Sequence, residues 1–262
     1  MSAADSEVLY EVRDRVAYIT LNRPERRNAL SQALTNRLGE VFTDAAEDDE
    51  IWAVVITGAG DRAFCAGADL KELNQIAQEG GRFPTPMTGT ERNLFELVLE
   101  VGKPTIASLN GPAVAGGFEL ALACDIRIAA EHAMVGMPEA KRGMGANFAS
   151  VLLPRLVPRS VALGMLYLGE LMSPQEAVRW GLITAVHPSE RLRDETEAYV
   201  RRIVANAPLT LRRYKEMATK GWELSVPAAL RLNVGPNPYL SSDRVEGVRA
   251  FVEKRPPRWT GK

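Results

Sequence analysis

The sequence predicts an α/β fold with a mainly parallel sheet, followed by a helical C-terminal region. Apolar, β-rich runs of strand length recur in its first half, at 51–57, 104–110 and 125–130. Such runs are typical of strands buried on both faces. Helical stretches separate them, and strands that alternate with helices favour right-handed crossovers and parallel pairing. After about Ala146 strand signals become rare and helical patterns dominate. We expect an α/β core over residues 1–200 and a helical region over 201–262.

The first predicted element is a β-hairpin. Residues 8–22 alternate around Asp14 and Arg15, which indicates two antiparallel strands joined by a turn. A loop at 24–28 follows, and a helix begins at about Ser31, a suitable N-cap. The apolar residues of this helix fall at i, i+4, i+7, i+8 and i+11 and so share one face: Leu34, Leu38, Val41, Phe42 and Ala45.

Further helices are expected between and after the buried strands, at about 69–78, 90–101 and 117–124. Residues 173–176, Ser-Pro-Gln-Glu, are a strong helix start. They combine an N-cap, a proline at the first helical position, and a glutamate three residues after the cap. The Gly- and Pro-rich stretch 80–89 predicts the most flexible loop of the core.

Composition is that of a soluble globular protein. The 262 residues, 46% hydrophobic and 25% charged, can bury a sizeable core. The net charge of −1 provides no global field that would attract nucleic acid or an anionic membrane. The polar, acidic N-terminus lacks an apolar signal region, and no apolar run approaches the roughly 18 residues of a membrane span. We expect a cytoplasmic protein with no nucleic-acid or membrane partner.

Cysteines and histidines are few, which limits metal and redox chemistry. Cys65 and Cys124 lie in small apolar surroundings without CxxC spacing, so we expect buried free thiols in a reducing compartment. His132 and His187 are isolated from each other in the sequence, so a His-rich metal site is not expected. We predict no bound metal.

Two motif-like stretches have simpler interpretations. VVITGAGDRA resembles a strand followed by the GxGxxA dinucleotide fingerprint, but Ala66-Gly67 interrupts the helix that such a turn must open. The basic cluster at 212–215 lies on a predicted helix, and a solvated helix face explains it better than a nucleic-acid site. Motifs of P-loop proteins, zincins and α/β-hydrolases are missing from the sequence.

Three stretches stand out as candidates for chemistry. AFCAGADLKE leaves a buried strand through small residues and enters a helix, which lets a ligand approach the backbone closely. GPAVAGGFELALACD has two adjacent glycines at a helix start, with Glu119 in the first turn. MVGMPEAKRGMG places Glu139 after a proline. Taken singly, these are explained by a tight turn, a carboxylate at a helix end, and an exposed loop glutamate.

Taken together, the three stretches suit the activation of an acyl carbonyl. That chemistry needs two backbone N–H donors aimed at one oxygen in a dry site. Two tight Gly/Ala turns at the ends of adjacent parallel strands can supply one donor each. Two carboxylates in unlike environments can hold opposite protonation states, because burial raises a pKa and a helix N-terminus lowers it. Such a site transfers protons without a metal or redox cofactor.

The chain resembles the crotonase (enoyl-CoA hydratase/isomerase) superfamily in four ordered motifs: NRPERRNAL, AFCAGADLKE, GPAVAGGFELALACD and PEAKRG. The resemblance runs from about Val8 to the C-terminal FVEKRPP stretch. It implies a crotonase-like core of repeated ββα units with a C-terminal helical trimerisation region, assembled as a trimer or a dimer of trimers. It also implies an acyl-CoA thioester substrate and no separate cofactor, because coenzyme A is part of the substrate.

The resemblance further implies roles for particular residues. The peptide N–H groups of Ala68 and Gly116 would form the oxyanion hole. Family hydratases carry two glutamates, matched here by Glu119 and Glu139, whereas similar isomerases usually keep only the second. Other residues would contact the coenzyme A or the substrate, the last two often across a subunit boundary: Arg26, Arg27, Ala29, Ala66, Asp69, Leu70, Lys71, Phe251 and Lys254.

The paired glutamates favour an enoyl-CoA hydratase, a hydro-lyase of fatty acid metabolism that converts a 2,3-enoyl-CoA to a 3-hydroxyacyl-CoA. Glu139 would donate the proton and Glu119 would position and activate water. The alternatives are an isomerase or another acyl-CoA reaction that uses one glutamate, and a non-catalytic or RNA-binding member. The stretch AKRGMGANFAS departs from the Gly/Pro-rich family pattern. We therefore expect Asn147, Phe148 and the loop at 80–89 to shape the acyl pocket.

Overall fold

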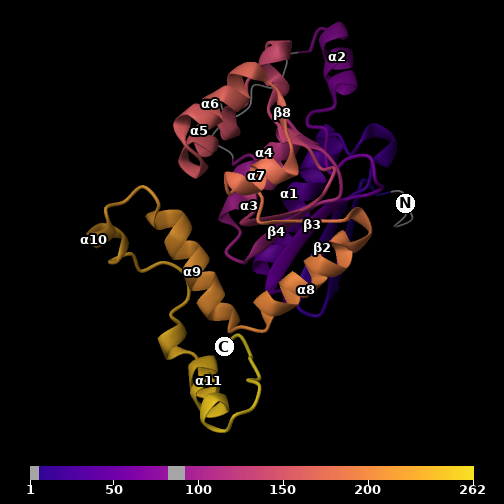
Figure 1. The fold of residues 1–262 in the computed structure, drawn as a ribbon. Helices are drawn as coiled ribbons and strands as arrows, with labels where there is room; N and C mark the ends of the chain where they lie inside the picture. Colours follow the sequence, from indigo (N-terminus) through magenta and orange to yellow (C-terminus); the bar gives the residue numbers. More distant parts are fainter. Residues whose placement is uncertain (1–5, 82–91) are drawn as a thin grey trace.

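A six-stranded sheet lies at the centre of the protein, as seen in a computed structural model that describes residues 6–81 and 92–262 (Figure 1). Its strands, in spatial order, are β1 (Val8–Arg13), β2 (Val16–Leu21), β3 (Ala53–Gly58), β4 (Thr105–Leu109), β6 (Ile126–Ala130) and β9 (Ala185–His187). The β1–β2 pair is antiparallel, and all the other neighbours are parallel. The predicted mainly parallel sheet is confirmed.

A second, smaller sheet lies beside the first. Its strands, in spatial order, are β5 (Ala113–Val114), β7 (Val135–Gly136) and β8 (Leu171–Met172). Two isolated parallel bridges extend this pairing to neighbouring loops: Cys65 pairs with Ala113 of β5, and Leu30 pairs with Ala68. The sequence did not predict this sheet, because strands of two residues are too short to show an alternating pattern.

In the described part of the N-terminal half, the helices are α1 (Gln32–Glu47), α2 (Leu70–Gln78), α3 (Leu94–Glu100) and α4 (Gly116–Ala123). The N-cap of α1 is Ser31, as predicted, and its hydroxyl accepts a hydrogen bond from the Leu34 N–H. The predicted apolar face of α1 is buried along its whole length. A capping box at Asn93 starts α3, whose expected start near residue 90 is therefore a few residues early.

The C-terminal half is mainly helical, as predicted. Its helices are α5 (Asn147–Leu156), α6 (Arg159–Leu168), α7 (Pro174–Arg179), α8 (Leu192–Val204), α9 (Pro208–Gly221), α10 (Val226–Ala229) and α11 (Ser242–Val252). Short 3-10 helices are η2 (Pro24–Arg26), η3 (Pro138–Arg142), η4 (Ser189–Arg191) and η5 (Pro238–Leu240). The predicted cap at Ser173 is confirmed, since its side chain accepts from the Glu176 N–H.

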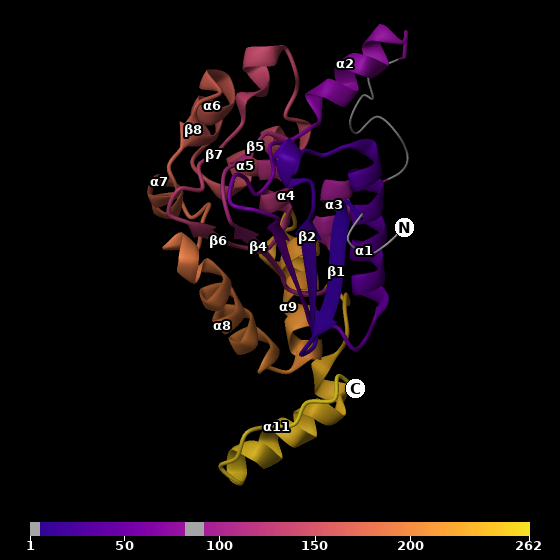
Figure 2. The same cartoon turned by 90° about the vertical axis from the view of Figure 1, so that its right-hand side faces the viewer.

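Figures 1 and 2 show how the C-terminal helices are arranged. α8 packs against the main sheet, α9 contacts α3 and reaches β4 through its buried residue Lys215, and α11 lies at the far end of the molecule. The predicted division between residues 200 and 201 falls within α8 and stays a prediction. In the described ranges, no helix is both long and apolar enough to cross a membrane.

Several local predictions can be compared directly with the structure. The hairpin turn residues Asp14 and Arg15 both adopt positive φ, at 49° and 67°. Cys65 and Cys124 are free and buried, as expected. Of the Gly- and Pro-rich stretch 80–89, residues 82–89 lie outside the described residues.

Candidate active site

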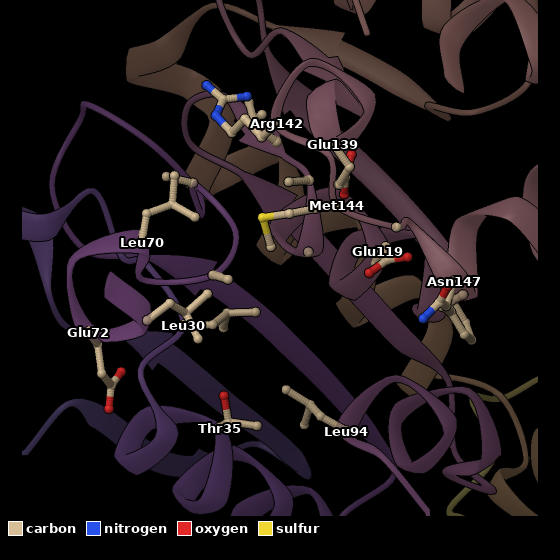
Figure 3. A pocket seen from close by; sticks show the side chains of 18 of the residues that line it. Leu30, Thr35, Leu70, Glu72, Leu94, Glu119, Glu139, Arg142, Met144 and Asn147 are labelled. Carbon is tan, nitrogen blue, oxygen red and sulfur yellow. The ribbon is translucent and has the colours of Figure 1, made fainter. Parts of the chain in front are cut away.

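A cavity of about 780 Å³ lies where the loops before α2 and α4 meet α1, α3, η3 and α5 (Figure 3). Six of the predicted site residues line it: Ala66, Ala68, Leu70, Gly116, Glu119 and Glu139. They come from three stretches that are far apart in the sequence, so the fold brings the three candidate motifs to one place.

The backbone around Ala68 leaves its N–H available to the cavity. In the bridge between Leu30 and Ala68, the Leu30 N–H donates to the Gly67 carbonyl at 2.8 Å. The Asp69 N–H donates to the Leu30 carbonyl at 3.0 Å. These two bonds flank Ala68, whose own N–H is therefore directed to the opposite side of the chain, where the cavity lies.

The start of α4 supplies a second available donor at Gly116. The preceding residue, Ala115, has φ 56° and ψ −132°, a conformation that residues other than glycine rarely adopt. Its N–H donates to the Gly136 carbonyl at 2.9 Å, which fixes this turn against β7. The first N–H groups of a helix have no intrahelical acceptor, so the Gly116 N–H remains free for another partner.

Glycines allow the two donor-bearing turns to touch. A Cβ added at Gly67 would lie 2.8 Å from the Ala115 Cβ and 3.1 Å from the Gly116 nitrogen. A Cβ at Gly117 would lie only 2.2 Å from the Cys65 carbonyl oxygen. The adjacent glycines therefore bring the N-terminus of α4 directly against the loop that carries Ala68. The rest of α4 is buried on all sides, which explains the apolar run after them.

Glu119 lies in the first turn of α4 and is 6% exposed. One of its oxygens, Oε1, accepts a hydrogen bond from the Ala149 N–H at 2.9 Å. Burial raises the pKa of Glu119 to about 7, and the negative charge of Glu139 adds to the rise. The Ala149 and Phe148 N–H groups oppose it. The helix N-terminus does not bring the pKa of Glu119 down, because burial outweighs it.

Glu139 lies in η3 and is 7% exposed. Burial raises its pKa, while its own N–H and the Arg142 charge oppose the rise. Its Oε2 has no hydrogen-bond partner within the described part of the chain. A buried carboxyl oxygen without a partner is costly, which is typical of a group that awaits a ligand or water. Figure 3 shows Glu119 and Glu139 on the same side of the cavity.

Asp69 is engaged within the protein. It is 6% exposed and caps α2 by accepting from the Lys71 and Glu72 N–H groups. Its other oxygen pairs with Arg23 at 3.0 Å, and Arg23 also donates to the Ala29 carbonyl at 2.8 Å. Asp69 and Arg23 thus tie the two loops beside the cavity together. A contact between Asp69 and coenzyme A stays a prediction.

The remaining predicted contact residues lie outside the cavity wall. Arg27 is beside it, since its carbonyl accepts from the Ala66 N–H at 3.1 Å. Phe251 and Lys254 are far from the cavity of their own chain, in or directly after α11 at the other end of the molecule (Figures 1 and 2). The other predicted contacts do not line the cavity either: Arg26, Ala29 and Lys71.

The cavity also contains residues that the sequence did not single out. Leu73 and Ile76 extend the inner face of α2 that begins with Leu70, and this three-residue spacing was a usable signal. Arg142 and Met144 gave no such signal, because both follow Glu139 in a stretch without periodicity. Asn147 and Phe148 line the cavity, consistent with the expected acyl pocket, and the Phe148 ring lies 5.5 Å from that of Phe95.

Across residues 6–81 and 92–262, no cluster of three or more histidine, cysteine or acidic side chains could hold a metal ion. The polar groups that the cavity offers include backbone N–H donors, three carboxyls and the guanidinium of Arg142.

Comparisons with known proteins identify the class to which this fold and cavity belong. (E)-Benzylidenesuccinyl-CoA hydratase of Thauera aromatica is 36% identical over 263 residues, covering 97% of this chain and 99% of that protein. Carnitinyl-CoA dehydratase of Citrobacter koseri is 36% identical over 251 residues, covering 93% and 94%. The crystal structure of enoyl-CoA hydratase from Mycobacterium tuberculosis superposes with a TM-score of 0.87 at 32% identity, covering 98% of this chain and 100% of that one. These likenesses define a crotonase-superfamily protein.

The family can be stated more narrowly. A family model described as Enoyl-CoA hydratase/isomerase matches residues 11–262. The chain belongs to the enoyl-CoA hydratase/isomerase family, and the predicted crotonase-like α/β fold is confirmed. The C-terminal trimerisation region stays a prediction.

Proposed function

We propose that this enzyme hydrates the 2,3 double bond of an enoyl-CoA thioester to give a 3-hydroxyacyl-CoA. The observation that carries the proposal is the pair of buried carboxyls, Glu119 and Glu139, on one wall of the cavity that Ala68 and Gly116 also line. A reaction that used one glutamate would not need the second carboxyl. Burial of a carboxyl without a function would only lower the stability of the fold.

The two backbone donors polarise the substrate in this proposal. The thioester oxygen accepts from the N–H groups of Ala68 and Gly116, and the negative charge that develops there is stabilised in a dry, mainly apolar surrounding. One donor of this kind contributes on the order of 3 kcal/mol to transition-state stabilisation. The contact between the Gly67 turn and α4 supports the idea that the two donors serve one oxygen.

The two glutamates exchange protons with water and substrate. Ionised Glu119 takes a proton from water as the water oxygen bonds to Cβ, and the double-bond electrons move onto the polarised thioester. Cα then takes the proton of Glu139. Glu119 ends protonated and Glu139 ionised, and solvent restores both. Burial raises the pKa of both carboxyls, to about 7 at Glu119, which supports proton exchange by the pair. The donor role of Glu139 is the assignment that the pH dependence of the rate tests. The Ala149 hydrogen bond to one Glu119 oxygen leaves the other for water.

The test is the loss of enoyl-thioester absorbance when the protein is added to a panel of enoyl-CoA substrates, with mass analysis of the product. We expect the addition of one water and the loss of turnover by about 100-fold or more in Glu119→Gln and Glu139→Gln, which keep the side-chain shape. Glu170→Gln, the same change at an exposed position, is the control and should hydrate normally.

Two outcomes would contradict the proposal. Full activity in both glutamine variants would remove the acid/base assignment. A double-bond shift without uptake of water would instead select an isomerase.

A further inference from the structure

Arg142 is the cationic side chain of the cavity wall. It ends η3, three residues after Glu139, so the two residues lie about one turn of 3-10 helix apart. Figure 3 shows the Arg142 side chain beside the Glu139 segment, and the residue is exposed, which puts its guanidinium at the rim. The residue thus lies next to one of the two carboxyls assigned to the reaction.

The guanidinium of Arg142 acts on the nearby Glu139 carboxyl, whose pKa it lowers, without forming an ion pair with it. The described residues that line the cavity include three carboxyls, at Glu72, Glu119 and Glu139, and one cation, at Arg142. Among the ion pairs of the described residues, none involves Arg142. Its Nη1 donates to the Pro138 carbonyl at 3.3 Å, which uses one of five N–H donors.

The rest of the wall makes this cation unusual. Leu70, Leu73, Leu94 and Met144 present apolar surface to the same cavity. A hydrocarbon acyl chain would match that surface but would gain nothing from a guanidinium and would partly exclude its water. A carboxylate carries the charge opposite to that of a guanidinium and can accept two parallel hydrogen bonds from N–H groups in its plane. Such a two-point pair is stronger than a contact between a carboxylate and a point charge.

We propose that Arg142 makes the site selective for acyl-CoA thioesters whose acyl group carries a second, free carboxylate. This inference rests on the proposed function for the position of the thioester. The acyl carboxylate accepts hydrogen bonds from the guanidinium at the rim, while the carbon chain between the two ends lies against the apolar wall. Arg142 acts as a specificity residue and takes no part in the proton transfers.

The phosphates of coenzyme A offer the same anionic chemistry, so the test must separate them from an acyl carboxylate. Arg142 follows Glu139, whereas the predicted coenzyme A contacts lie on three other stretches, 26–29, 66–71 and 251–254. Coenzyme A without an acyl group therefore serves as a probe of the phosphate alternative.

The experiment measures dissociation constants by calorimetry for saturated, unreactive ligands. Succinyl-, glutaryl- and adipyl-CoA are each compared with the neutral acyl-CoA of the same chain length, and free coenzyme A is added. The variants are Arg142→Leu, Arg142→Lys and the matched control Lys141→Leu, which removes the same charge from the adjacent residue outside the cavity wall.

We expect wild type to bind at least one of the carboxylated ligands about 10-fold more tightly than its neutral partner. Arg142→Leu should abolish this ratio, Arg142→Lys should keep part of it, and Lys141→Leu should leave it unchanged. Free coenzyme A should bind wild type and Arg142→Leu equally. A wild-type ratio near one, a ratio that persists in Arg142→Leu, or an equal loss of affinity for free coenzyme A would overturn the inference.

Turnover separates this inference from the proposed function. Hydration of neutral crotonyl-CoA without any preference for carboxylated ligands would defeat the role of Arg142 and leave the hydratase intact. An Arg142-dependent preference in binding without hydration of any enoyl-CoA, neutral or carboxylated, would defeat the hydratase and leave the selectivity for an acyl carboxylate.

Discussion

At the scale of single residues, ionisation of the Glu119 carboxyl affects both the stability of the fold and the proposed proton transfer. The first turn of α4 is buried around it, and the ionised form therefore loses solvation that one hydrogen bond from Ala149 only partly replaces. This is why its pKa rises to about 7. The group is close to half-ionised at neutral pH, which suits proton exchange and makes the folded protein less stable when the group is charged.

Glu119→Gln should stabilise the protein at alkaline pH. The folded pKa of about 7 lies above the ordinary value of 4.5, so the stability that this group contributes is fully present below about pH 4.5. It is lost as the pH rises through about 7, and the loss amounts to roughly 3 kcal/mol. Urea unfolding at pH 5 and pH 8.5 should show a larger gain for the glutamine variant at pH 8.5. An equal effect at both values would contradict the raised pKa.

The same titration should govern catalysis. If Glu119 must be ionised to activate water, kcat/KM should rise with pH through an apparent pKa near 7, since that constant reports the free enzyme. Initial rates of enoyl-CoA hydration between pH 5 and 9 provide the measurement. If kcat/KM instead fell as the pH rose through 7, the roles of the two glutamates would be the reverse, with Glu119 as the acid.

At the scale of elements, α4 lies so close to the Cys65 loop that only a glycine fits at position 117. Gly117→Ala should destabilise the protein by roughly 3 kcal/mol or more, because the new Cβ would lie 2.2 Å from a backbone oxygen and backbone must move. Gly164→Ala in α6 is a suitable control. A Cβ there meets nothing within 4 Å, so it should stabilise the helix by up to about 1 kcal/mol. Thermal unfolding of both variants tests the opposite signs.

The N-cap of α2 combines two interactions in one side chain. Asp69→Ala should lose the cap and leave Arg23 without its Asp69 partner, at a combined cost of about 2–3 kcal/mol. Asp69→Asn keeps an oxygen for the cap and should cost less. Urea denaturation gives both values: the loss in Asp69→Asn measures the contribution of the Arg23 pair, and the further loss in Asp69→Ala measures the contribution of the cap. Equal losses in the two variants would show that the cap contributes nothing beyond the ion pair.

The elements differ in how far the sequence could predict them. Long periodic elements could be predicted: the buried face of α1 follows from five apolar residues spaced over twelve positions of a 16-residue helix, and the buried strands follow from continuous apolar runs. β5, β7 and β8 have two residues each, so only their three-dimensional pairing defines them. The four motifs located the loops of Ala68 and Gly116. Arg142 was missed because a charged residue shortly after a proline-glutamate pair is typical of any exposed turn. Only the three-dimensional structure shows that it lines the cavity.

At the scale of the whole molecule, the C-terminal region is unusually apolar on its surface. Large side chains there are exposed in the single chain: Val226, Leu230, Tyr239, Leu240, Val248 and Phe251. Monomeric proteins rarely leave so many together without a partner. Because α11 stands far from the cavity of its own chain, the predicted contacts of Phe251 and Lys254 with coenzyme A require a second subunit (Figure 2).

We therefore expect a trimer or a dimer of trimers in solution. Sedimentation velocity at several protein concentrations should give one of these masses, and Leu240→Asp should shift the population toward smaller species by adding a charge to the apolar surface. A monomer at all concentrations that retains full hydratase activity would contradict both the assembly and the contribution of a neighbouring subunit to the site.

The turns at Ala68 and Gly116 have an evolutionary consequence. Both present main-chain N–H groups, which only a substitution by proline would delete, and they depend on their neighbours chiefly for small size, as at Gly67 and Gly117. Side chains at positions 119, 139 and 142 can be exchanged without rebuilding those turns. We infer that the means of polarising the carbonyl is retained as such a scaffold diverges. The side chains that transfer protons and those that select the acyl chain can be substituted separately from it.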